Sequence, residues 1–146
     1  MDLEKYRGIV AVSGDGLVYE IFNGLGSRAD AKEAIKIPIA QIPGGSANAF
    51  ACSLSYAADE VFRNLTLDEF ATAMTFNLIK SKPSPLDIVS IQLCDKTVVQ
   101  SFLSVQWAII ADVDLESEKY RFLGEMRFTI GAIKRILGIY FYFYFF

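Results

Sequence analysis

The sequence contains no histidine, and only two of its 146 residues are cysteines. Without histidine there can be no Ser-His-Asp or Cys-His catalysis, and no metal site built on imidazole. Any catalysis must therefore use carboxylates, Lys, Tyr, Ser or backbone dipoles. Cys52 and Cys94 stand in apolar surroundings without CxxC spacing. This predicts two reduced thiols that act as small core side chains in a reducing compartment.

Basic residues are also scarce, with 14 Lys and Arg against 17 Asp and Glu and a net charge of −3. No segment concentrates them, so a nucleic-acid partner is not expected. Residues 1–7 are charged and lack the apolar core of a signal peptide. The aromatic run 138–146 is too short to span a bilayer. It fits an exposed strand, an interfacial anchor or a truncation scar, and we favour the scar.

The most informative stretch is Ser13-Gly14-Asp15-Gly16, which lies between an apolar run at 8–12 and a segment with helical periodicity at 17–25. This pattern predicts a strand, a tight turn and a helix. Ligands of open α/β sheets bind at the carboxyl ends of strands, where glycines allow close approach of the backbone. Asp15 could there accept a proton from a hydroxyl or hold a metal. The alternative is a plain turn in which Asp15 caps the next helix.

The same pattern returns about thirty residues later, as expected of neighbouring β-α units in a nucleotide-binding sheet. A second apolar strand at 38–42 is closed by Pro43, and Gly44-Gly45-Ser46-Ala47-Asn48 leads into a helix over 49–54. Neither turn matches GxxxxGK[ST] or GxGxxG, so the P-loop does not fit and a dinucleotide site is weakly supported.

Further along, Thr66 and Glu69 predict a capping box at the start of a helix that extends to about Lys80. A hinge at 81–85 precedes a half-exposed antiparallel strand at 86–93 and a β-rich segment at 97–110. The change in composition places a domain boundary near residue 83.

Two groups of charged residues follow. Asp112 and Asp114 share a face if their segment is extended, and they suit either a solvated loop or a site for a cation or substrate amine. Arg121 and Arg127 lie on a helix expected over about 118–137 and suit either an anionic ligand or a charged outer face. The buried side of that helix is expected to consist of Ile130, Ile133, Ile136 and Leu137.

Together these stretches resemble the sphingosine kinases, lipid kinases with a diacylglycerol-kinase-type catalytic domain. The similarity covers residues 6–137, including the two glycine turns, and is strongest over 101–107 and 111–128. It implies an α/β fold: a partial Rossmann-like nucleotide-binding lobe at 1–82, then the start of a β-sandwich lipid-binding lobe at 83–146. It also implies that the chain is a fragment of the catalytic domain.

The resemblance implies transfer of the ATP γ-phosphate to the primary hydroxyl of sphingosine, giving sphingosine 1-phosphate, with Mg²⁺ accompanying ATP. The alternatives are an inactive fragment that acts as a binding module, and a diacylglycerol or ceramide kinase. The expected partners are a sphingoid base, a membrane surface bound peripherally and a second copy in a homodimer. The expected location is cytoplasmic, with recruitment to membranes.

The same resemblance assigns roles to individual residues. Asp15 is the expected catalytic base, and no residue is assigned as a metal ligand. The residues expected to contact the lipid substrate are Ser13, Gly14, Asp15, Gly16, Ser104 and Asp114. Those expected to contact ATP are Glu20, Gly45, Ser46, Ala47, Arg121 and Arg127. Ala47 replaces a glycine of the family pattern, which costs about 1 kcal/mol if that position requires a positive φ.

Overall fold

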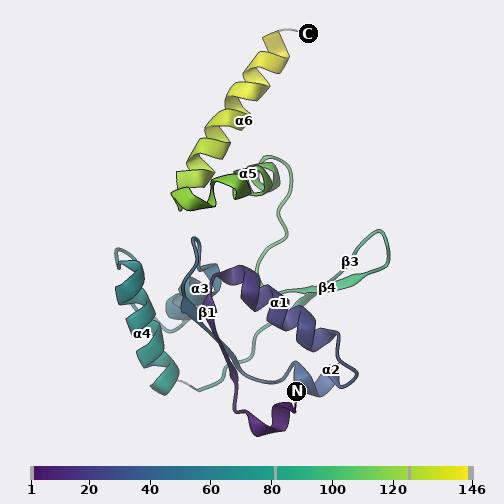
Figure 1. Ribbon diagram of the computed structural model, residues 1–146, viewed down its shortest axis with the longest axis vertical. Helices are drawn as coiled ribbons and strands as arrows, with labels where there is room; N and C mark the ends of the chain where they lie inside the picture. The colour runs from purple at the N-terminus through teal and green to yellow at the C-terminus, as the bar shows by residue number, and fades with distance from the viewer. Residues whose placement is uncertain (1, 81, 125, 145–146) are drawn as a thin grey trace. The chain divides into compact units, whose positions relative to one another are not determined.

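The computed structural model describes residues 2–80, 82–124 and 126–144. Two compact units make up the chain, Met1–Leu103 and Ser104–Phe146, and each is described by itself. The elements (Figure 1) are the 3-10 helices η1 (Leu3–Lys5) and η2 (Glu118–Leu123), the strands β1 (Ile9–Ser13), β2 (Ile39–Pro43), β3 (Val89–Gln92) and β4 (Val98–Ser101), and the helices α1 (Asp15–Gly26), α2 (Ala31–Ala34), α3 (Ala49–Ala57), α4 (Leu67–Lys80), α5 (Ile109–Ser117) and α6 (Met126–Tyr144).

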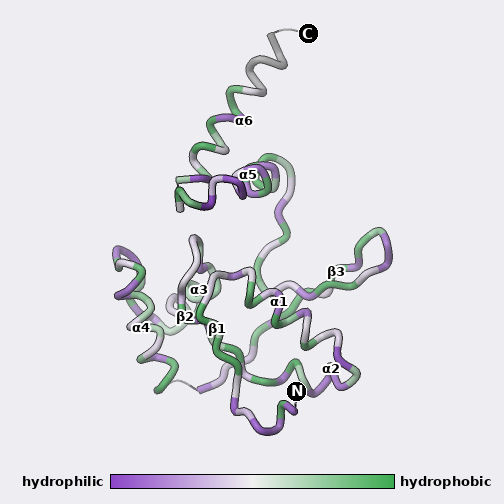
Figure 2. The backbone as a smooth tube through the Cα atoms, in the orientation of Figure 1, coloured by the Kyte–Doolittle hydropathy of each residue, from purple (hydrophilic) through white to green (hydrophobic). Residues whose placement is uncertain are grey.

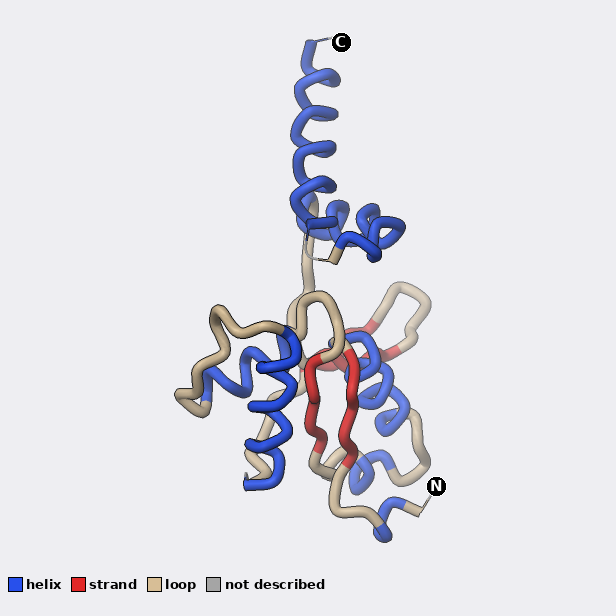
Figure 3. The backbone as a smooth tube through the Cα atoms, turned by 60° about the vertical axis from the view of Figure 1, so that its left-hand side comes forward, coloured by secondary structure: helices blue, strands red, loops and turns tan. Residues whose placement is uncertain are grey.

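The first unit is built on the parallel pair β1 and β2, whose register runs from Ile9↔Ile39 to Ser13↔Pro43. Figure 2 shows β1 as an apolar segment. The strands lie between α1 and α4 (Figure 3), with α1 in contact with β1 and α4 in contact with β2. Because Ser13 and Pro43 are paired, the turns that follow them leave the sheet at the same edge. The two predicted strand–turn–helix units are thus confirmed.

The core of this unit consists of two apolar clusters joined by α3. Phe50 packs with Ala11, Val18 and Phe22, and Phe102 adds a ring 5.0 Å from that of Phe50. The next residue of α3, Ala51, packs with Phe70 and Met74 of α4. Consecutive residues at the start of α3 thus face different clusters, and this fixes the helix between α1 and α4.

The hairpin β3–β4 belongs to the first unit because it is tied to α1. The side chain of Asn23 donates to the carbonyl of Gln100 at 2.9 Å and accepts from its N–H at 2.8 Å. Phe102 then packs on Phe22, with ring centroids 5.2 Å apart. The predicted antiparallel strand is confirmed over Val89–Gln92. The compact unit therefore ends after Leu103, whereas the change in composition suggested a boundary near residue 83.

The predicted capping box is confirmed at the start of α4. The backbone N–H and the hydroxyl of Thr66 both donate to the Glu69 carboxylate at 2.8 Å, and the Glu69 N–H donates back to the hydroxyl at 3.3 Å. The hydrogen bond from the Thr66 N–H and, to a lesser extent, the one from the Thr66 hydroxyl lower the pKa of Glu69 below its ordinary value. This reciprocal pair satisfies donors that helix formation leaves unpaired.

The prediction of β structure over 97–110 is wrong beyond Ser101, where β4 ends. The strand β4 ends where its partner β3 begins, and α5 starts at Ile109. A β-rich composition cannot extend a strand without a neighbour to accept its hydrogen bonds. The helix expected over 118–137 is also interrupted, because Gly124 adopts φ 58° between η2 and α6.

The buried face predicted for this helix is wrong. Ile130, Ile133, Ile136 and Leu137 are exposed by 38 to 56%. The side of α6 that packs against α5 instead carries Arg127 and Gly131, both buried. A Cβ on Gly131 would lie 3.2 Å from a side-chain methyl of Val113, so the two helices pack closely at this glycine.

The fold is mixed α/β, as predicted, whereas the Rossmann-like and β-sandwich assignments remain predictions. Cys52 is partly buried, but Cys94 is exposed beside the β3–β4 turn, so its expected core position is wrong. The aromatic run is helical as far as Tyr144, which rules out the strand interpretation for that part. Phe145 and Phe146, like Ser81 of the predicted hinge, lie outside the described residues. No helix within the described ranges combines the length and apolar character needed to cross a membrane.

Ala108 provides a test of backbone strain, because it precedes α5 with φ 56° and ψ −134°, a region that favours glycine. Ala108→Gly should raise the free energy of unfolding by about 1 kcal/mol, measured by urea denaturation. Ala132→Gly, inside α6, should lower it by about 1 kcal/mol. Equal effects of the two substitutions would contradict the strain at Ala108.

Candidate active site

Asp15 caps a helix other than its own. Its carboxylate accepts hydrogen bonds from the N–H groups of Ala49 at 2.9 Å and Phe50 at 3.0 Å, at the start of α3. Its own helix, α1, has Gly14 as N-cap and no side-chain capping bond. The interpretation of Asp15 as a local cap of α1 is therefore wrong. Asp15 links the end of one β-α unit to the beginning of the next.

Gln41 completes this cap and was not among the predicted site residues. Its side chain, 1% exposed, donates from Nε2 to the Ser13 carbonyl and accepts from the Ala51 N–H, both at 2.9 Å. The first three N–H groups of α3 are thus all bound to side chains from the β1 and β2 units. A single polar residue within the apolar strand 39–42 was the signal that could have identified it.

Asn48 closes the second glycine turn. Its Oδ1 accepts from the N–H groups of Gly44 at 3.2 Å and Gly45 at 2.8 Å, and its Nδ2 donates to the Gly45 carbonyl at 2.7 Å. Asn48 adopts φ 52°, and Ala47 is not among the residues with positive φ. The condition for strain at Ala47 is therefore not met.

The two glycine turns touch through their backbones. A Cβ on Gly45 would lie 2.4 Å from the Cα of Gly14 and 3.0 Å from its nitrogen. Neither atom can move without shifting the turn that carries it. This contact holds the turn before Asp15 against the turn before α3.

The backbone donors left for an anion agree only in part with the expected Gly45, Ser46 and Ala47. The N–H group of Gly45 is bound to Asn48, and those of Ala49, Phe50 and Ala51 at the start of α3 are bound to Asp15 and Gln41. Within residues 2–80, the structure records no hydrogen bond for the N–H groups of Ser46, Ala47, Gly16 and Leu17. Gly16 and Leu17 lie in the first turn of α1, where helix geometry leaves N–H groups unpaired. An anion is thus better served by α1 and the tip of the second turn.

The first unit brings together most of its predicted site residues. The two turns that meet at the edge of the β1–β2 pair carry Ser13, Gly14, Asp15, Gly16, Gly45, Ser46 and Ala47. Glu20 is exposed on α1, beyond the first turn. The remaining four predicted residues lie in the second unit, where Ser104 is exposed in the segment before α5.

In the second unit, Asp114, Arg121 and Arg127 belong to one chain of ion pairs. Arg127 lies 3.4 Å from Asp114 and 3.3 Å from Glu118, and Arg121 lies 3.0 Å from Glu118. The condition under which Asp112 and Asp114 would share a face, an extended segment, is not met, because α5 is helical there. Asp112 pairs instead with Arg135, at 3.5 Å.

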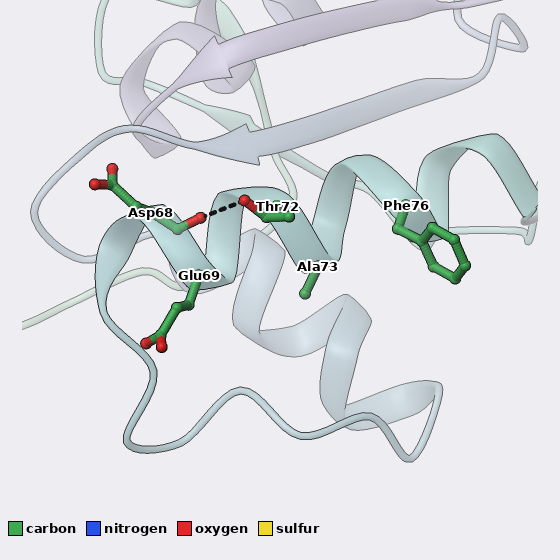
Figure 4. Close-up of a pocket in the computed structure, with 5 residues that line it drawn as sticks. All are labelled: Asp68, Glu69, Thr72, Ala73 and Phe76. Atoms are coloured by element: carbon green, nitrogen blue, oxygen red, sulfur yellow. Dashed lines mark hydrogen bonds between the residues drawn. The ribbon is translucent and has the colours of Figure 1, made fainter.

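Among the described residues, neither a group of metal ligands nor the hollow on α4 marks the two glycine turns. Within the parts of the chain that the structure describes, no group of three or more His, Cys, Asp or Glu could hold a metal ion. An open hollow of about 530 Å³ lies on α4 (Figure 4) and is lined by Asp68, Glu69, Thr72, Ala73 and Phe76. All five come from one helix, and none was predicted to act in the site.

Comparisons with known proteins agree with the motifs. The profile of the diacylglycerol kinase catalytic domain matches residues 1–91. Over 138 residues the chain is 41% identical to sphingosine kinase 1 of Homo sapiens, covering 94% of this chain and 35% of that protein. It is 41% identical to sphingosine kinase 1 of Arabidopsis thaliana over 137 residues, covering 94% of this chain and 27% of that protein. It is 39% identical to sphingoid long chain base kinase 4 of Schizosaccharomyces pombe over 137 residues, covering 93% of this chain and 27% of that protein.

These comparisons confirm the resemblance predicted from the two glycine turns and the segment 111–128. They also show how far it extends, because the chain spans about a third or less of the length of these curated relatives.

The contact between the turns predicts that Gly45→Ala lowers the free energy of unfolding by about 3 kcal/mol, because the added methyl meets backbone. Gly24→Ala is the matched control in α1, where a Cβ has nothing within 4 Å. It should stabilise the chain by about 0.5–1 kcal/mol. Urea denaturation followed by circular dichroism measures both, and an unaffected Gly45→Ala chain would show that the turns do not touch.

Gln41→Leu should lower the free energy of unfolding by about 2–3 kcal/mol, because it removes two hydrogen bonds and leaves the buried Ala51 N–H without an acceptor. Gln92→Leu makes the same change at an exposed position on β3 and should stay within about 0.5 kcal/mol of the parent. Similar thermal unfolding curves for the two variants would contradict the role assigned to Gln41.

Proposed function

This chain belongs to the diacylglycerol kinase catalytic domain family, and we propose that it carries the phosphoryl-transfer site of a sphingosine kinase. In this proposal the γ-phosphate of ATP passes to the primary hydroxyl of sphingosine and gives sphingosine 1-phosphate. Two of the three relatives bear the name sphingosine kinase and the third the name sphingoid long chain base kinase, which supports a sphingoid base as substrate. The proposal concerns the whole protein's activity, of which this chain spans only part.

The observation that carries the proposal is the position of the Asp15 carboxylate. It lies where β1 and β2 both end, with its two oxygens oriented by the N–H groups of Ala49 and Phe50. Each oxygen keeps a second lone pair. A hydroxyl brought to this edge could therefore give its proton to Asp15 as its oxygen attacks the phosphate.

The phosphates of ATP would lie against the donors that the fold leaves unused. The N–H groups of Gly16 and Leu17 at the start of α1, and those of Ser46 and Ala47, are available beside Asp15. Such groups bind anions without a side-chain charge. Mg²⁺ bound to ATP would neutralise part of the charge on the phosphate oxygens.

The second unit would supply the groups that distinguish substrates. Arg121 and Arg127 would hold phosphate oxygens, Ser104 would contact the polar head of the lipid, and Asp114 would pair with its ammonium. A diacylglycerol or a ceramide offers no ammonium, so this carboxylate favours a sphingoid base. Since sphingosine is a membrane lipid, we also propose peripheral recruitment to membranes from the cytoplasm. A homodimer is likewise part of the proposal.

A second candidate is a fragment that binds nucleotide without turning over. The observation behind it is that the donors beside Asp15 lie entirely within the first unit, so a nucleotide could bind there without the groups of the second unit.

The test is ATP-dependent phosphorylation of sphingosine by the purified chain, compared with Asp15→Asn. Loss of the base should lower the rate about 10²- to 10⁴-fold. Asp59→Asn is the control, because Asp59 is exposed in a turn with φ 55°, which asparagine tolerates. It should keep the parent rate.

Circular dichroism is used to check that the Asp15→Asn variant is folded. Full activity in the folded variant would overturn the role of Asp15. If the chain binds Mg·ATP but transfers no phosphate, under conditions in which human sphingosine kinase 1 does, the nucleotide-binding fragment is the better description.

A further inference from the structure

Arg127 lies in the second unit between two carboxylates. Its Nη2 is 3.4 Å from Asp114 of α5, and its Nη1 is 3.3 Å from Glu118. The guanidinium also lies over the ring of Phe128, 4.2 Å from its centroid. Only 8% of the Arg127 side chain is exposed, whereas Asp114 and Glu118 are about half exposed. The arginine is thus enclosed, and the carboxylates face solvent on one side.

In this arrangement, two groups that are proposed to bind ligands form an ion pair with each other. The proposed function gives Asp114 to the ammonium of the lipid and Arg127 to the phosphates of the nucleotide, and the role of their ion pair in binding rests on that proposal. While the Asp114–Arg127 pair is intact, Asp114 already has a cation and Arg127 already has its anions. Each group must leave the other before it can take its ligand fully.

We propose that the Asp114–Arg127 ion pair is a lock that the ammonium of the lipid and the phosphates of the nucleotide open together. The incoming ammonium replaces Arg127 at Asp114, and the released guanidinium turns to the phosphate oxygens. Arg127 keeps its contact with Glu118 during this exchange. Its Nε, buried and without a hydrogen-bond partner among the described residues, gives it a further donor. Opening the lock therefore breaks the Asp114–Arg127 ion pair and leaves the Glu118–Arg127 ion pair intact.

Linkage gives the direction of the effect. Both ligands bind the open form, so whichever binds first bears the cost of opening, and the second binds more tightly. The coupling is reciprocal for the two affinities. A lipid without an ammonium offers Asp114 no replacement cation and cannot open the lock. Arg127 thus becomes a determinant of specificity for amine-bearing lipids, because only a lipid with an ammonium strengthens nucleotide binding.

A matched pair on the same two helices serves as the control. Asp112 of α5 lies 3.5 Å from Arg135 of α6 and is 48% exposed, against 49% for Asp114. Arg135 also has a second carboxylate, Glu116, at 2.6 Å. Asp112→Asn therefore removes an ion pair of the same kind between α5 and α6 without touching either proposed ligand group.

The experiment is calorimetric titration of the chain with a non-hydrolysable Mg·ATP analogue in detergent micelles. Three kinds of micelle are compared: micelles without added lipid, micelles with sphingosine and micelles with diacylglycerol. In the parent chain, sphingosine should lower the Kd of the nucleotide about five-fold or more, and diacylglycerol should leave it unchanged. Asp114→Asn should bind the nucleotide more tightly than the parent without lipid and lose the response to sphingosine. Asp112→Asn should respond as the parent does.

The outcomes separate this proposal from the proposed function. A parent chain that binds the nucleotide with the same Kd in all three micelles overturns the lock and leaves the kinase proposal intact. An equal response to diacylglycerol also overturns it. A parent chain that binds no nucleotide in any micelle overturns both. The comparison of lipids uses the parent chain alone, so it decides the matter even if Asp114→Asn does not fold.

Discussion

The first unit depends on how the start of α3 is capped. A helix leaves its first N–H groups unpaired, and here Asp15 and Gln41 bind three of them. Because these side chains come from two different β-α units, the cap is a tertiary contact. It sets α3 against the end of the parallel strands. The same bonds orient the Asp15 carboxylate, so one interaction both stabilises the fold and prepares the proposed base.

Close approach of backbones supports this cap. Gly14 and Gly45 bring the two turns within a distance that no side chain would allow, and Asn48 closes the second turn with its own amide. The backbone donors left for an anion are therefore those of the expected residues Ser46 and Ala47, together with Gly16 and Leu17 at the start of α1. Glycines in such turns therefore serve the contact between turns as much as the approach of a ligand.

The second unit is organised by arginines that pair with carboxylates. Arg127 joins α6 to Asp114 of α5 and to Glu118 of η2, and Arg135 joins α6 to Asp112 and Glu116 of α5. Because charged side chains and Gly131 form the packed side of α6, Ile130, Ile133 and Ile136 remain exposed in this unit. A periodic apolar stripe predicts the buried face of a helix only where apolar neighbours are present to cover it.

The sequence by itself determined the two strand–turn–helix units, the capping box of α4, the β3–β4 hairpin and the family to which the chain belongs. These features depend on local periodicity, on turn residues and on short motifs, all of which are contiguous in the chain. Only the tertiary structure decided which helix Asp15 caps, that Gln41 shares that role, where β4 ends and which face of α6 packs. Each of these depends on partners distant in sequence: Asp15 lies 34 residues before Ala49, and Asp114 lies 13 residues before Arg127. No local pattern encodes the choice of a distant hydrogen-bond acceptor or counter-ion.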